Sequence, residues 1–505
     1  MTNDKVLIGA IDQGTSSTRF LIYQFNPMKI IASHQIEIKQ YFPQSGWMEI
    51  DPEEVIFTVI KCMDECYKVI QDRANLESTQ IKAVGISTQR ETTVLWDSET
   101  GKALYNAIVW LDSRTADLAL EFIDKTTCKQ DITGLPIHPY FSALKIRWLL
   151  DNVPSVQSAL KRGKLMFGTI DSWIIYKLTG RHITDVTNAS RTLLMSIKAL
   201  NWDKSLCDFF QISMDILPKI HSSAEIYATI STGCFKGVPL SGSLGDQQAA
   251  LFGEHCLELS ETKCTYGTGT FMLTNIGNNI IISKNGLLTT VAYQLGPNAE
   301  VCYALEGSGS IGGNAIRFLR DNLQIIQDAS EVESAAFSVS ETNGVVFVPC
   351  FTGLYTPYWD STARGILCGL TQTSKKAHIV RAALEAVCFQ TKEMIDAVQA
   401  DLPHDWKIKT LKIDGGMTVS SMFPQLLSDI VGLDVIKSAH TEASCWGAAM
   451  AAAIGANIIS FQEAKGYRVK DVHIQKANIS TEQRQLMIHR WKEAIRRARG
   501  WLHTD

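Results

Sequence analysis

Short apolar runs separated by polar turns characterise the first ninety residues and favour strands followed by a helix. The runs at 6–11, 19–23 and 81–87 are apolar over most of their length, which predicts buried strands. Asp51 and Pro52, followed by two glutamates, are typical of a helix start. The apolar face of that predicted helix consists of Ile56, Val59, Ile60, Met63, Tyr67 and Ile70.

The second half of the chain repeats this pattern. The predicted strands are 264–266, 271–275, 287–293, 301–306, 345–348 and 411–414, with a helix at 377–398. Each half begins with strands around a Gly/Thr turn and ends in strand–helix alternation. We therefore predict an α/β fold of two related lobes, with mixed β-sheets flanked by helices. A polar stretch at 256–261 places the domain boundary between 1–256 and 257–505. Ser480 and Gln483 form a predicted capping box that opens a last helix.

Composition and charge limit the classes of function. Of 505 residues, 45% are hydrophobic and 20% charged, as in soluble globular proteins. The net charge of −4 does not favour nucleic acid as a partner, because such binding rewards a basic surface. The apolar runs are too short for a transmembrane segment or a secretory signal. The twelve cysteines are scattered without CxxC pairs, mostly in apolar runs. We therefore expect a cytoplasmic protein.

Two Gly/Thr turns follow predicted strands, one in each half. In the first, DQGTSSTR at 12–19, backbone N–H groups and hydroxyls can meet phosphate oxygens, and Arg19 can neutralise phosphate charge. Asp12, at the strand end, can hold Mg²⁺ through water. The second is YGTGTF at 266–271, and a facing pair of such turns suits a nucleotide clamp. Alternatively each is a plain hairpin, and the GxxxxGK spacing of a Walker A loop is absent.

Asp246 follows a predicted strand at 238–243 and opens a helix in the run GDQQAALFG. A helix N-terminus favours anionic groups. The carboxylate is either a helix cap or a general base that takes the proton of an attacking hydroxyl. The run DGG at 414–416 is either a simple turn or a close backbone approach to a flat ligand.

Arg90 and Glu91 lie together between two predicted strands. Inside a cleft, a guanidinium and a carboxylate satisfy both the acceptor and the donor sides of a diol. On the surface such a pair would contribute little. Trp110 and Phe271 could cover the carbon side of a polyol, although either could instead be core.

Longer runs show a family resemblance over nearly the whole chain. They include SGWMEIDP at 45–52, TQRETTVLW at 88–96, PYFSALKIRWLLDN at 139–152, TDVTNASRT at 184–192, YALEG at 303–307 and GILCGLTQTSKKAHIVRAALE at 365–385. Together they resemble the FGGY carbohydrate kinases of the actin/hexokinase-like ATPase superfamily, and most of all the members that phosphorylate glycerol. The resemblance implies two actin/RNase H-like lobes with the active site between them. It also implies ATP, Mg²⁺ and glycerol as ligands, sn-glycerol 3-phosphate as the product, and a homodimer or higher homo-oligomer.

The same resemblance assigns roles to residues by motif. The residues that it implies for glycerol binding are Arg90, Glu91, Trp110, Tyr140, Asp246, Gln247 and Phe271, with Asp246 as the general base. Nucleotide binding falls to Thr15, Ser16, Ser17, Arg19, Thr268, Gly313, Arg317, Gly416 and Ser420. Asp12 and Asp246 would lie close to the magnesium ion.

Departures from the family pattern concentrate near the expected nucleotide site. Arg317 and Ser420 stand where many bacterial members have glutamine and asparagine. Trp446 is bulkier than the leucine that the family usually has in this run. It either packs in the core, the commoner fate of tryptophan, or borders the purine. The loop at 234–238 lacks a Gly-Arg anion clamp, so we expect no inhibition by fructose 1,6-bisphosphate.

Three other functions compete with this interpretation. A kinase of the same family that acts on a pentulose would need a larger polar pocket than Arg90, Glu91 and Trp110 suggest. An actin-like or heat-shock-type ATPase would have no need for these residues. A catalytically silent relative is disfavoured by the presence of both Asp12 and Asp246.

Overall fold

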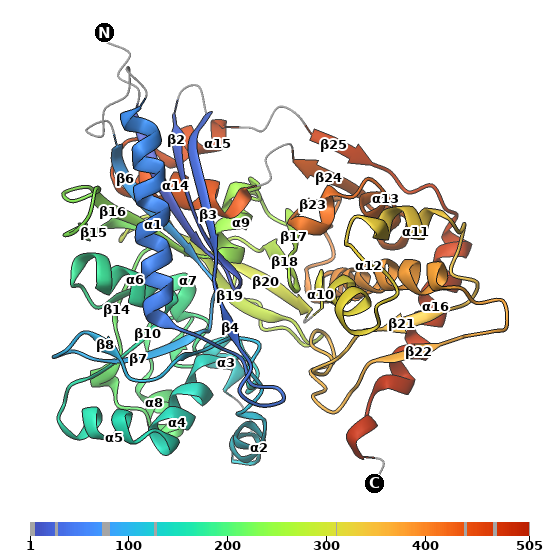
Figure 1. Ribbon diagram of the computed structural model, residues 1–505, viewed down its shortest axis with the longest axis horizontal. Coiled ribbons are helices and arrows are strands. Elements are labelled where there is room, and N and C mark those ends of the chain that lie inside the picture. The colour runs from blue at the N-terminus through green and yellow to red at the C-terminus, as the bar shows by residue number, and fades with distance from the viewer. Residues whose placement is uncertain are drawn as a thin grey trace.

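The computed structural model describes residues 6–25, 29–72, 81–125, 129–309, 311–438, 442–467 and 472–503, arranged in two lobes (Figure 1). A six-stranded sheet organises the first lobe. Its strand order is β15 (Ala224–Thr229), β16 (Pro239–Gly245), β6 (Ile81–Thr88), β1 (Leu7–Gln13), β2 (Ser17–Gln24) and β3 (Lys29–Glu37). A seven-stranded sheet organises the second lobe. Its order is β19 (Leu288–Gln294), β20 (Val301–Gly309), β18 (Thr270–Asn275), β17 (Thr262–Tyr266), β23 (Thr410–Asp414), β24 (Asp434–Ser438) and β25 (Val472–Gln475).

The two sheets share one connectivity. β1 pairs antiparallel with β2 and parallel with β6, while β17 pairs antiparallel with β18 and parallel with β23. The next strands, β16 and β24, are again parallel, and β15 and β25 run antiparallel at the edge. The predicted duplication of an α/β lobe is therefore confirmed. It places the β1–β2 turn and the β17–β18 turn at equivalent positions of the two sheets.

Smaller elements complete the lobes. A second sheet of the first lobe contains β4 (Gln40–Tyr41), β5 (Glu49–Ile50), β7 (Thr93–Asp97), β8 (Lys102–Ala103), β9 (Ala107–Ile108) and β10 (Leu165–Thr169). The helices of the first lobe are α1 (Pro52–Gln71), α2 (Ala116–Asp124), α3 (Gln130–Thr133), α4 (Ser142–Asn152), α5 (Pro154–Lys161), α6 (Ile170–Thr179), α7 (Val186–Ala189), α8 (Lys204–Phe210) and α9 (Asp246–Gly253). The second lobe contains α10 (Asn314–Arg317), α11 (Glu331–Phe337), β21 (Val346–Val348), β22 (Ile366–Cys368), α12 (Lys376–Asp401), α13 (Met422–Val431) and α16 (Thr481–Ala498).

The predicted helix starts are confirmed. Asp51 caps α1 by accepting from the Glu53 N–H, and Ser480 and Gln483 form the capping box of α16. On α1 most of the predicted apolar face is buried, but Ile60 is 37% exposed, so its assignment to that face was wrong. The 3.6-residue period gives the direction of the face but not how far the neighbouring strands cover it.

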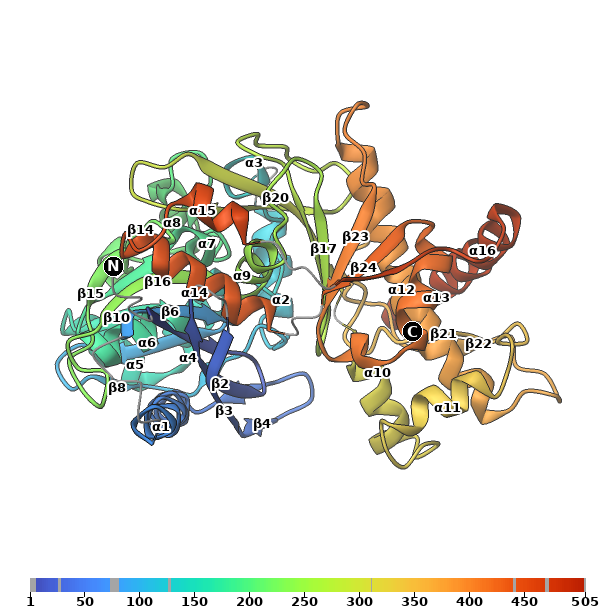
Figure 2. The same cartoon turned by 90° about the horizontal axis from the view of Figure 1, so that it is seen from above.

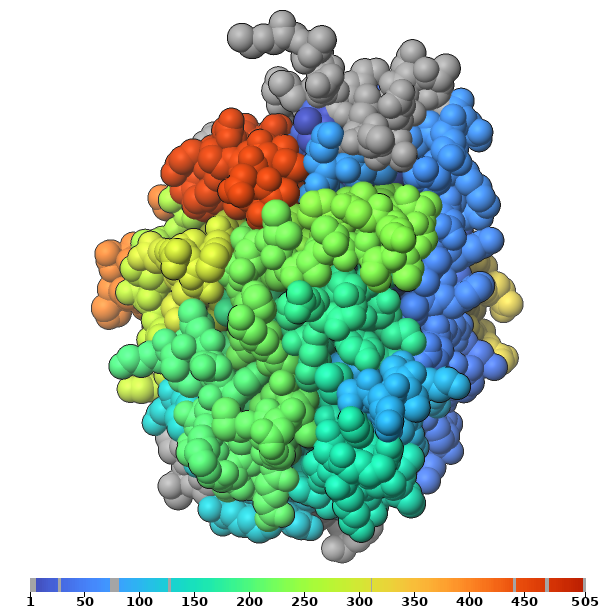
Figure 3. All heavy atoms as spheres, turned by 90° about the vertical axis from the view of Figure 1, so that its left-hand side faces the viewer, coloured from blue at the N-terminus to red at the C-terminus, as the bar shows by residue number. Residues whose placement is uncertain are grey.

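Helix α14 (Ala443–Gly455) returns from the second half of the chain to the first lobe. It packs on β1, β6, β16 and α9, as the view from above shows (Figure 2). A Cβ at Gly447 would lie 1.9 Å from the Ala249 carbonyl oxygen, so the glycine allows this close approach of α14 to α9. The following helix α15 (Phe461–Gly466) lies on the same lobe, and its orange-red surface adjoins green and blue segments (Figure 3).

Trp446 lies on α14 and is 3% exposed. Its ring centroid is 5.3 Å from that of Tyr23 and 5.1 Å from that of Phe25. The core alternative for this tryptophan is therefore the one the structure supports. In the loop at 234–238, Phe235 is buried against Phe20, whereas Lys236 is exposed.

Two global features complete the description. Within the described residues, no helix combines the length and the apolar character needed to span a bilayer. The cysteines in these ranges are free thiols, most of them buried.

Candidate active site

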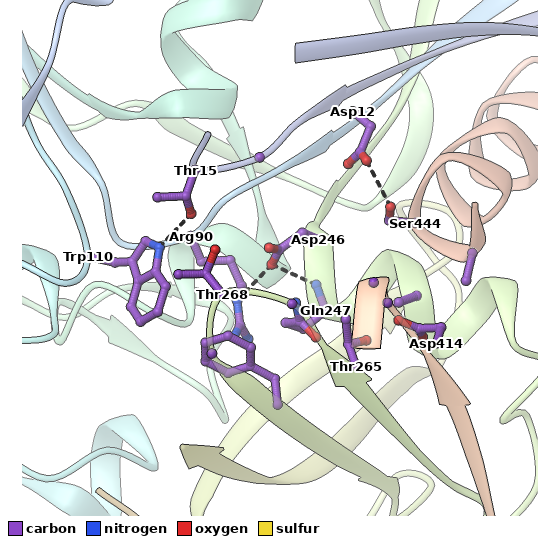
Figure 4. A pocket seen from close by; sticks show the side chains of 18 of the residues that line it. Asp12, Thr15, Arg90, Trp110, Asp246, Gln247, Thr265, Thr268, Asp414 and Ser444 are labelled. Atoms are coloured by element: carbon purple, nitrogen blue, oxygen red, sulfur yellow. Dashed lines mark hydrogen bonds and ion pairs between the residues drawn. The ribbon is translucent and has the colours of Figure 1, made fainter. Parts of the chain in front are cut away.

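A cavity of about 480 Å³ is lined by residues from both halves of the chain (Figure 4). It brings together most of the side chains singled out from the sequence. These are Asp12, Thr15, Arg19, Arg90, Glu91, Trp110, Tyr140, Asp246, Gln247, Thr268, Phe271 and Gly416. Both Gly/Thr turns contribute, because Gly14 and Thr15 come from the β1–β2 turn, and Gly267, Thr268 and Gly269 come from the β17–β18 turn.

A second cavity, of about 520 Å³, shares Gly267, Gly416 and Val419 with the first. Its walls are mostly apolar or small, and they include Gly313 and Ser420. The predicted residues Ser16, Ser17 and Arg317 line neither cavity, and Ser16 and Arg317 are exposed. The other predicted nucleotide residues are divided between the two adjoining cavities.

The Asp414–Gly416 turn lies at the junction of these cavities. Gly415 has φ +94°, and a Cβ there would meet the Tyr266 backbone at 2.6 Å. Only glycine fits such a position without strain. A Cβ on Gly416 would meet no atom within 4 Å, because this residue faces open space. The turn therefore offers bare backbone to a ligand.

Asp246 is the first residue of α9, and the N-cap is Gly245. Its Oδ1 accepts from the Gln247 N–H at 2.7 Å and lies 3.3 Å from Arg90 Nε. The side chain keeps 27% of its surface exposed. Burial raises the pKa of Asp246, while Arg90 and Lys263 oppose this rise. The carboxylate is oriented, accessible from the cavity, and able to accept a proton.

Arg90 and Glu91 do not pair with each other. Arg90 donates to both carboxylate oxygens of Glu306, at 2.6 and 2.8 Å, and Glu91 accepts from Arg191 Nε at 2.6 Å. Arg191 Nη2 also lies 3.3 Å from Glu306 Oε1, which closes a buried network of two arginines and two glutamates. Glu91 has φ +62°, which is uncommon for a non-glycine residue, and strained backbone of this kind tends to cluster at active sites and ligand-binding segments.

The network sets the charge of its carboxylates. Burial acts to raise the pKa of Glu306, but Arg191 and Arg90 outweigh it and bring the pKa to about 2. Burial raises the pKa of Glu91, against the attraction of Arg191 and Arg90. Glu306 therefore remains ionised and holds the Arg90 guanidinium beside Asp246.

Three aromatic rings also line the cavity. Trp110 lies 5.7 Å from Tyr140 and 5.3 Å from Phe271, measured between ring centroids and in edge-to-face geometry. The indole N–H of Trp110 donates to Thr15 Oγ1 at 2.8 Å, which fixes the ring against the β1–β2 turn. The lining thus combines charged groups with flat apolar rings, and the Arg90 guanidinium lies 5.7 Å from the centroid of the Phe271 ring.

Lys263 is a buried cation that the sequence did not reveal. Its ammonium donates to Gln247 Oε1 at 2.6 Å and to Thr265 Oγ1 at 2.7 Å. With its amide oxygen engaged, Gln247 keeps its NH₂ donors for other partners. Burial lowers the pKa of Lys263, and Asp414 opposes that change.

Asp12 and Arg19 face each other in the β1–β2 ladder. Asp12 Oδ2 accepts from Ser444 Oγ at 3.0 Å, whereas the Arg19 guanidinium is bonded to Glu442 and Gln35. A phosphate would therefore compete with Glu442 for Arg19. In the described parts of the chain, no three His, Cys, Asp or Glu side chains form a group that could hold a metal ion.

The sequence reasoning missed several residues that shape the site, namely Arg191, Lys263, Glu306, Glu442 and Ser444. Arg191 and Glu306 fall in runs that carry the family resemblance, TDVTNASRT and YALEG. A charged residue inside an otherwise apolar strand, such as Glu306 after Tyr303-Ala304-Leu305, was the available signal, because such residues are seldom buried unless paired.

Comparison with known proteins places the chain in a family. The models for the N-terminal and C-terminal domains of the FGGY family of carbohydrate kinases match residues 7–253 and 262–456. The chain belongs to this family. Among the relatives of this FGGY chain, a probable glycerol kinase from Caenorhabditis elegans is 53% identical and covers 98% of this chain and 99% of its own length.

Solved structures agree with the family assignment. The crystal structure of Plasmodium falciparum glycerol kinase with ADP has a TM-score of 0.87, 37% identity, and 98% coverage of both chains. A xylulose kinase from Lactobacillus acidophilus has a TM-score of 0.83 at 22% identity, with 97% coverage of both chains. The second likeness shows the fold alone, so the fold does not by itself identify the substrate of an FGGY kinase.

Proposed function

We propose that this FGGY kinase transfers the γ-phosphoryl group of ATP to glycerol, giving sn-glycerol 3-phosphate and ADP. The observation that carries the proposal is the mixed lining of the cavity around Asp246. Arg90, Glu91 and Gln247 supply polar groups, and Trp110 and Phe271 supply flat apolar rings.

Glycerol matches this mixed lining. Its hydroxyls donate and accept hydrogen bonds, which a guanidinium, a carboxylate and an amide satisfy together. Its carbon face has no polar group, which suits the edge-to-face pair of Trp110 and Phe271. A pentulose carries further hydroxyls, and some of these would lie unpaired against the rings. The glycerol kinases among the relatives, 53% identical in the case above, support the same substrate.

The two adjoining cavities accommodate ATP in the same proposal. The phosphates would lie between the Thr15 and Thr268 turns, and the adenosine in the apolar space lined by Gly313, Gly416 and Ser420. Backbone N–H groups in such turns are ready donors to phosphate oxygens. Arg317 is exposed, and Ser420 Oγ accepts from the Met422 N–H. We therefore assign neither side chain a contact with the adenine base.

Magnesium fits the carboxylates present. Asp12 and Asp246 both line the cavity. Burial is the main cause that raises the pKa of Asp12, and the nearby charge of Asp246 raises it further. Two such carboxylates suit Mg²⁺, which keeps several water or phosphate ligands and needs few protein oxygens. When bound, the ion would neutralise charge on the phosphates.

The chemical step assigned to the chain is short. Asp246 takes the proton of the attacking glycerol hydroxyl, whose oxygen forms a bond to the γ-phosphorus as the bond to the ADP oxygen breaks. Arg90 holds the polyol beside Asp246 while Glu306 holds Arg90. The contribution of the protein is mainly positioning, which removes much of the entropic part of the barrier.

Three further expectations from the sequence stay proposals. These are the domain division at 1–256 and 257–505, a homodimer or higher homo-oligomer, and a cytoplasmic location. Sedimentation of the purified chain and fluorescence imaging of a tagged chain would test the last two.

Product analysis tests the proposed function. The chain is incubated with ATP, Mg²⁺ and ¹³C-glycerol, and the product is followed by ³¹P and ¹³C NMR. We expect one phosphomonoester on a primary carbon that sn-glycerol-3-phosphate dehydrogenase oxidises. Phosphorylation of xylulose but not of glycerol would replace the proposal with the pentulose alternative.

A further inference from the structure

Lys145 is completely buried in the first turn of α4, five residues after Tyr140. Its ammonium donates to the carbonyl oxygens of Pro139, at 2.8 Å, and Tyr140, at 2.5 Å. A buried lysine costs free energy unless its donors are satisfied. Its hydrogen bonds therefore tie the α4 start to the turn that carries Tyr140.

Further hydrogen bonds hold the same turn. The Tyr140 N–H donates to His138 Nδ1 at 3.2 Å, so the main chain of Tyr140 is held at both its N–H and its carbonyl. Ser142 Oγ donates to the Glu91 carbonyl oxygen at 3.0 Å. The start of α4 thus holds two residues that line the cavity, Tyr140 and Glu91.

We propose that Lys145 is a positioning residue for the polyol end of the cavity, fixing the 139–140 main chain so that the Tyr140 ring stays against Trp110. The proposal rests on the proposed phosphorylation of glycerol. It assigns Lys145 no contact with substrate. Its effect passes through Tyr140, which lies 5.7 Å from Trp110 and is 1% exposed.

The charges around Lys145 are compatible with this role. Burial lowers its pKa to about 8, with Asp112 and Glu91 opposing the change and Arg114 adding to it. Burial and the Lys145 charge lower the pKa of His138 to about 3, so the imidazole is neutral at pH 7 and Nδ1 can accept the Tyr140 N–H. Below pH 8 the ammonium is charged, and its hydrogen bonds to the carbonyls are the stronger charge-assisted kind.

Lys412 provides a matched control. Its ammonium also donates to two consecutive carbonyls, those of Glu254 at 3.0 Å and His255 at 2.7 Å. These carbonyls lie outside the cavity that holds Asp246. If the hydrogen bonds of Lys145 to the carbonyls were purely structural, removing the Lys145 side chain should have the same effect as removing that of Lys412.

The test compares Lys145→Met, Lys145→Arg and Lys412→Met in the full chain. We expect Lys145→Met to raise the glycerol KM by roughly 10–100-fold, since two buried carbonyls lose their donor, while the ATP KM changes less than about twofold. Lys145→Arg should recover part of the loss, because arginine keeps the charge and the donors. Lys412→Met should lower the thermal midpoint and leave the glycerol KM unchanged.

A second measurement needs no variant. The glycerol KM of the unmodified chain should rise above about pH 8, as Lys145 loses its proton, and Lys145→Arg should flatten this rise. Equal changes in the glycerol and ATP KM values, or a normal glycerol KM in Lys145→Met, would overturn the proposal while glycerol turnover persists. Absence of glycerol turnover in the unmodified chain would instead overturn the proposed function, and this inference with it.

Discussion

Arg90 and Glu306, 216 positions apart in the chain, are joined by two hydrogen bonds of 2.6 and 2.8 Å. Arg90 follows β6 of the first lobe, and Glu306 belongs to β20 in the seven-stranded sheet of the second lobe. A bidentate pair of this kind fixes the plane of the guanidinium as well as its position. The position of Arg90 in the cavity lining is therefore fixed by both halves of the chain together.

Glu306→Gln tests this relationship. Removing one charge from the buried network leaves Arg90 and Arg191 less well compensated, which costs about 2 kcal/mol or more. We expect kcat/KM for glycerol to fall roughly 30-fold or more, with a smaller effect on the ATP KM. The exposed pair Arg320–Asp321 is the control, and Asp321→Asn should change neither constant. Equal losses for glycerol and ATP would mean that the network supports the fold rather than the polyol site.

Asp246→Asn tests the assignment of the base. The amide can still accept from the Gln247 N–H, and the cap of α9 is Gly245, so the thermal midpoint should be unchanged. Loss of the proton acceptor should lower kcat by roughly 10²–10⁴-fold. Near-normal turnover in a correctly folded variant would remove Asp246 from this role.

Gly416→Leu tests the nucleotide side. A side chain at this position would project into the space shared by the two cavities, where no atom lies within 4 Å of its Cβ. We expect the ATP KM to rise roughly tenfold or more while the fold is kept. Gly466→Leu is the control, because Gly466 is exposed and a Cβ added there would also meet no atom within 4 Å. An unchanged ATP KM in Gly416→Leu would place the nucleotide elsewhere.

Trp446→Leu tests the aromatic cluster under α14. The indole packs against Tyr23 and Phe25, so its loss leaves a cavity and should lower the free energy of unfolding by about 2–4 kcal/mol. Its Nε1 has no hydrogen-bond partner among the described residues, so no polar group is orphaned by the change. Denaturant titration measures the loss, and the ATP KM should stay normal. A raised ATP KM at unchanged stability would contradict this account.

The sequence predicted the parts of this protein that depend on local pattern. Strand ends and turns place Asp12 and Asp246, and the repeated order of strands and glycine turns predicted two related lobes. Capping chemistry predicted the starts of α1 and α16, because caps are formed by residues close in sequence.

Long-range pairing could not be predicted in the same way. Glu91 and Arg90 are neighbours in the chain, yet each pairs with a partner at least a hundred positions away. Arg19 could be assigned to phosphate from its turn, but its contact with Glu442 depends on α14 returning to the first lobe. Buried charges such as Lys263 have no periodic signature, because a single residue in a strand reports only which face it occupies.

A coupled assay of ADP release tests the central claim most directly. The purified chain is supplied with ATP and Mg²⁺, and glycerol, xylulose and no acceptor are compared at equal concentration. The account predicts glycerol-dependent ADP release, with little release in the other two cases and loss of the glycerol-dependent rate in Asp246→Asn. ADP release that is the same with and without glycerol, or that depends on xylulose instead, would contradict it.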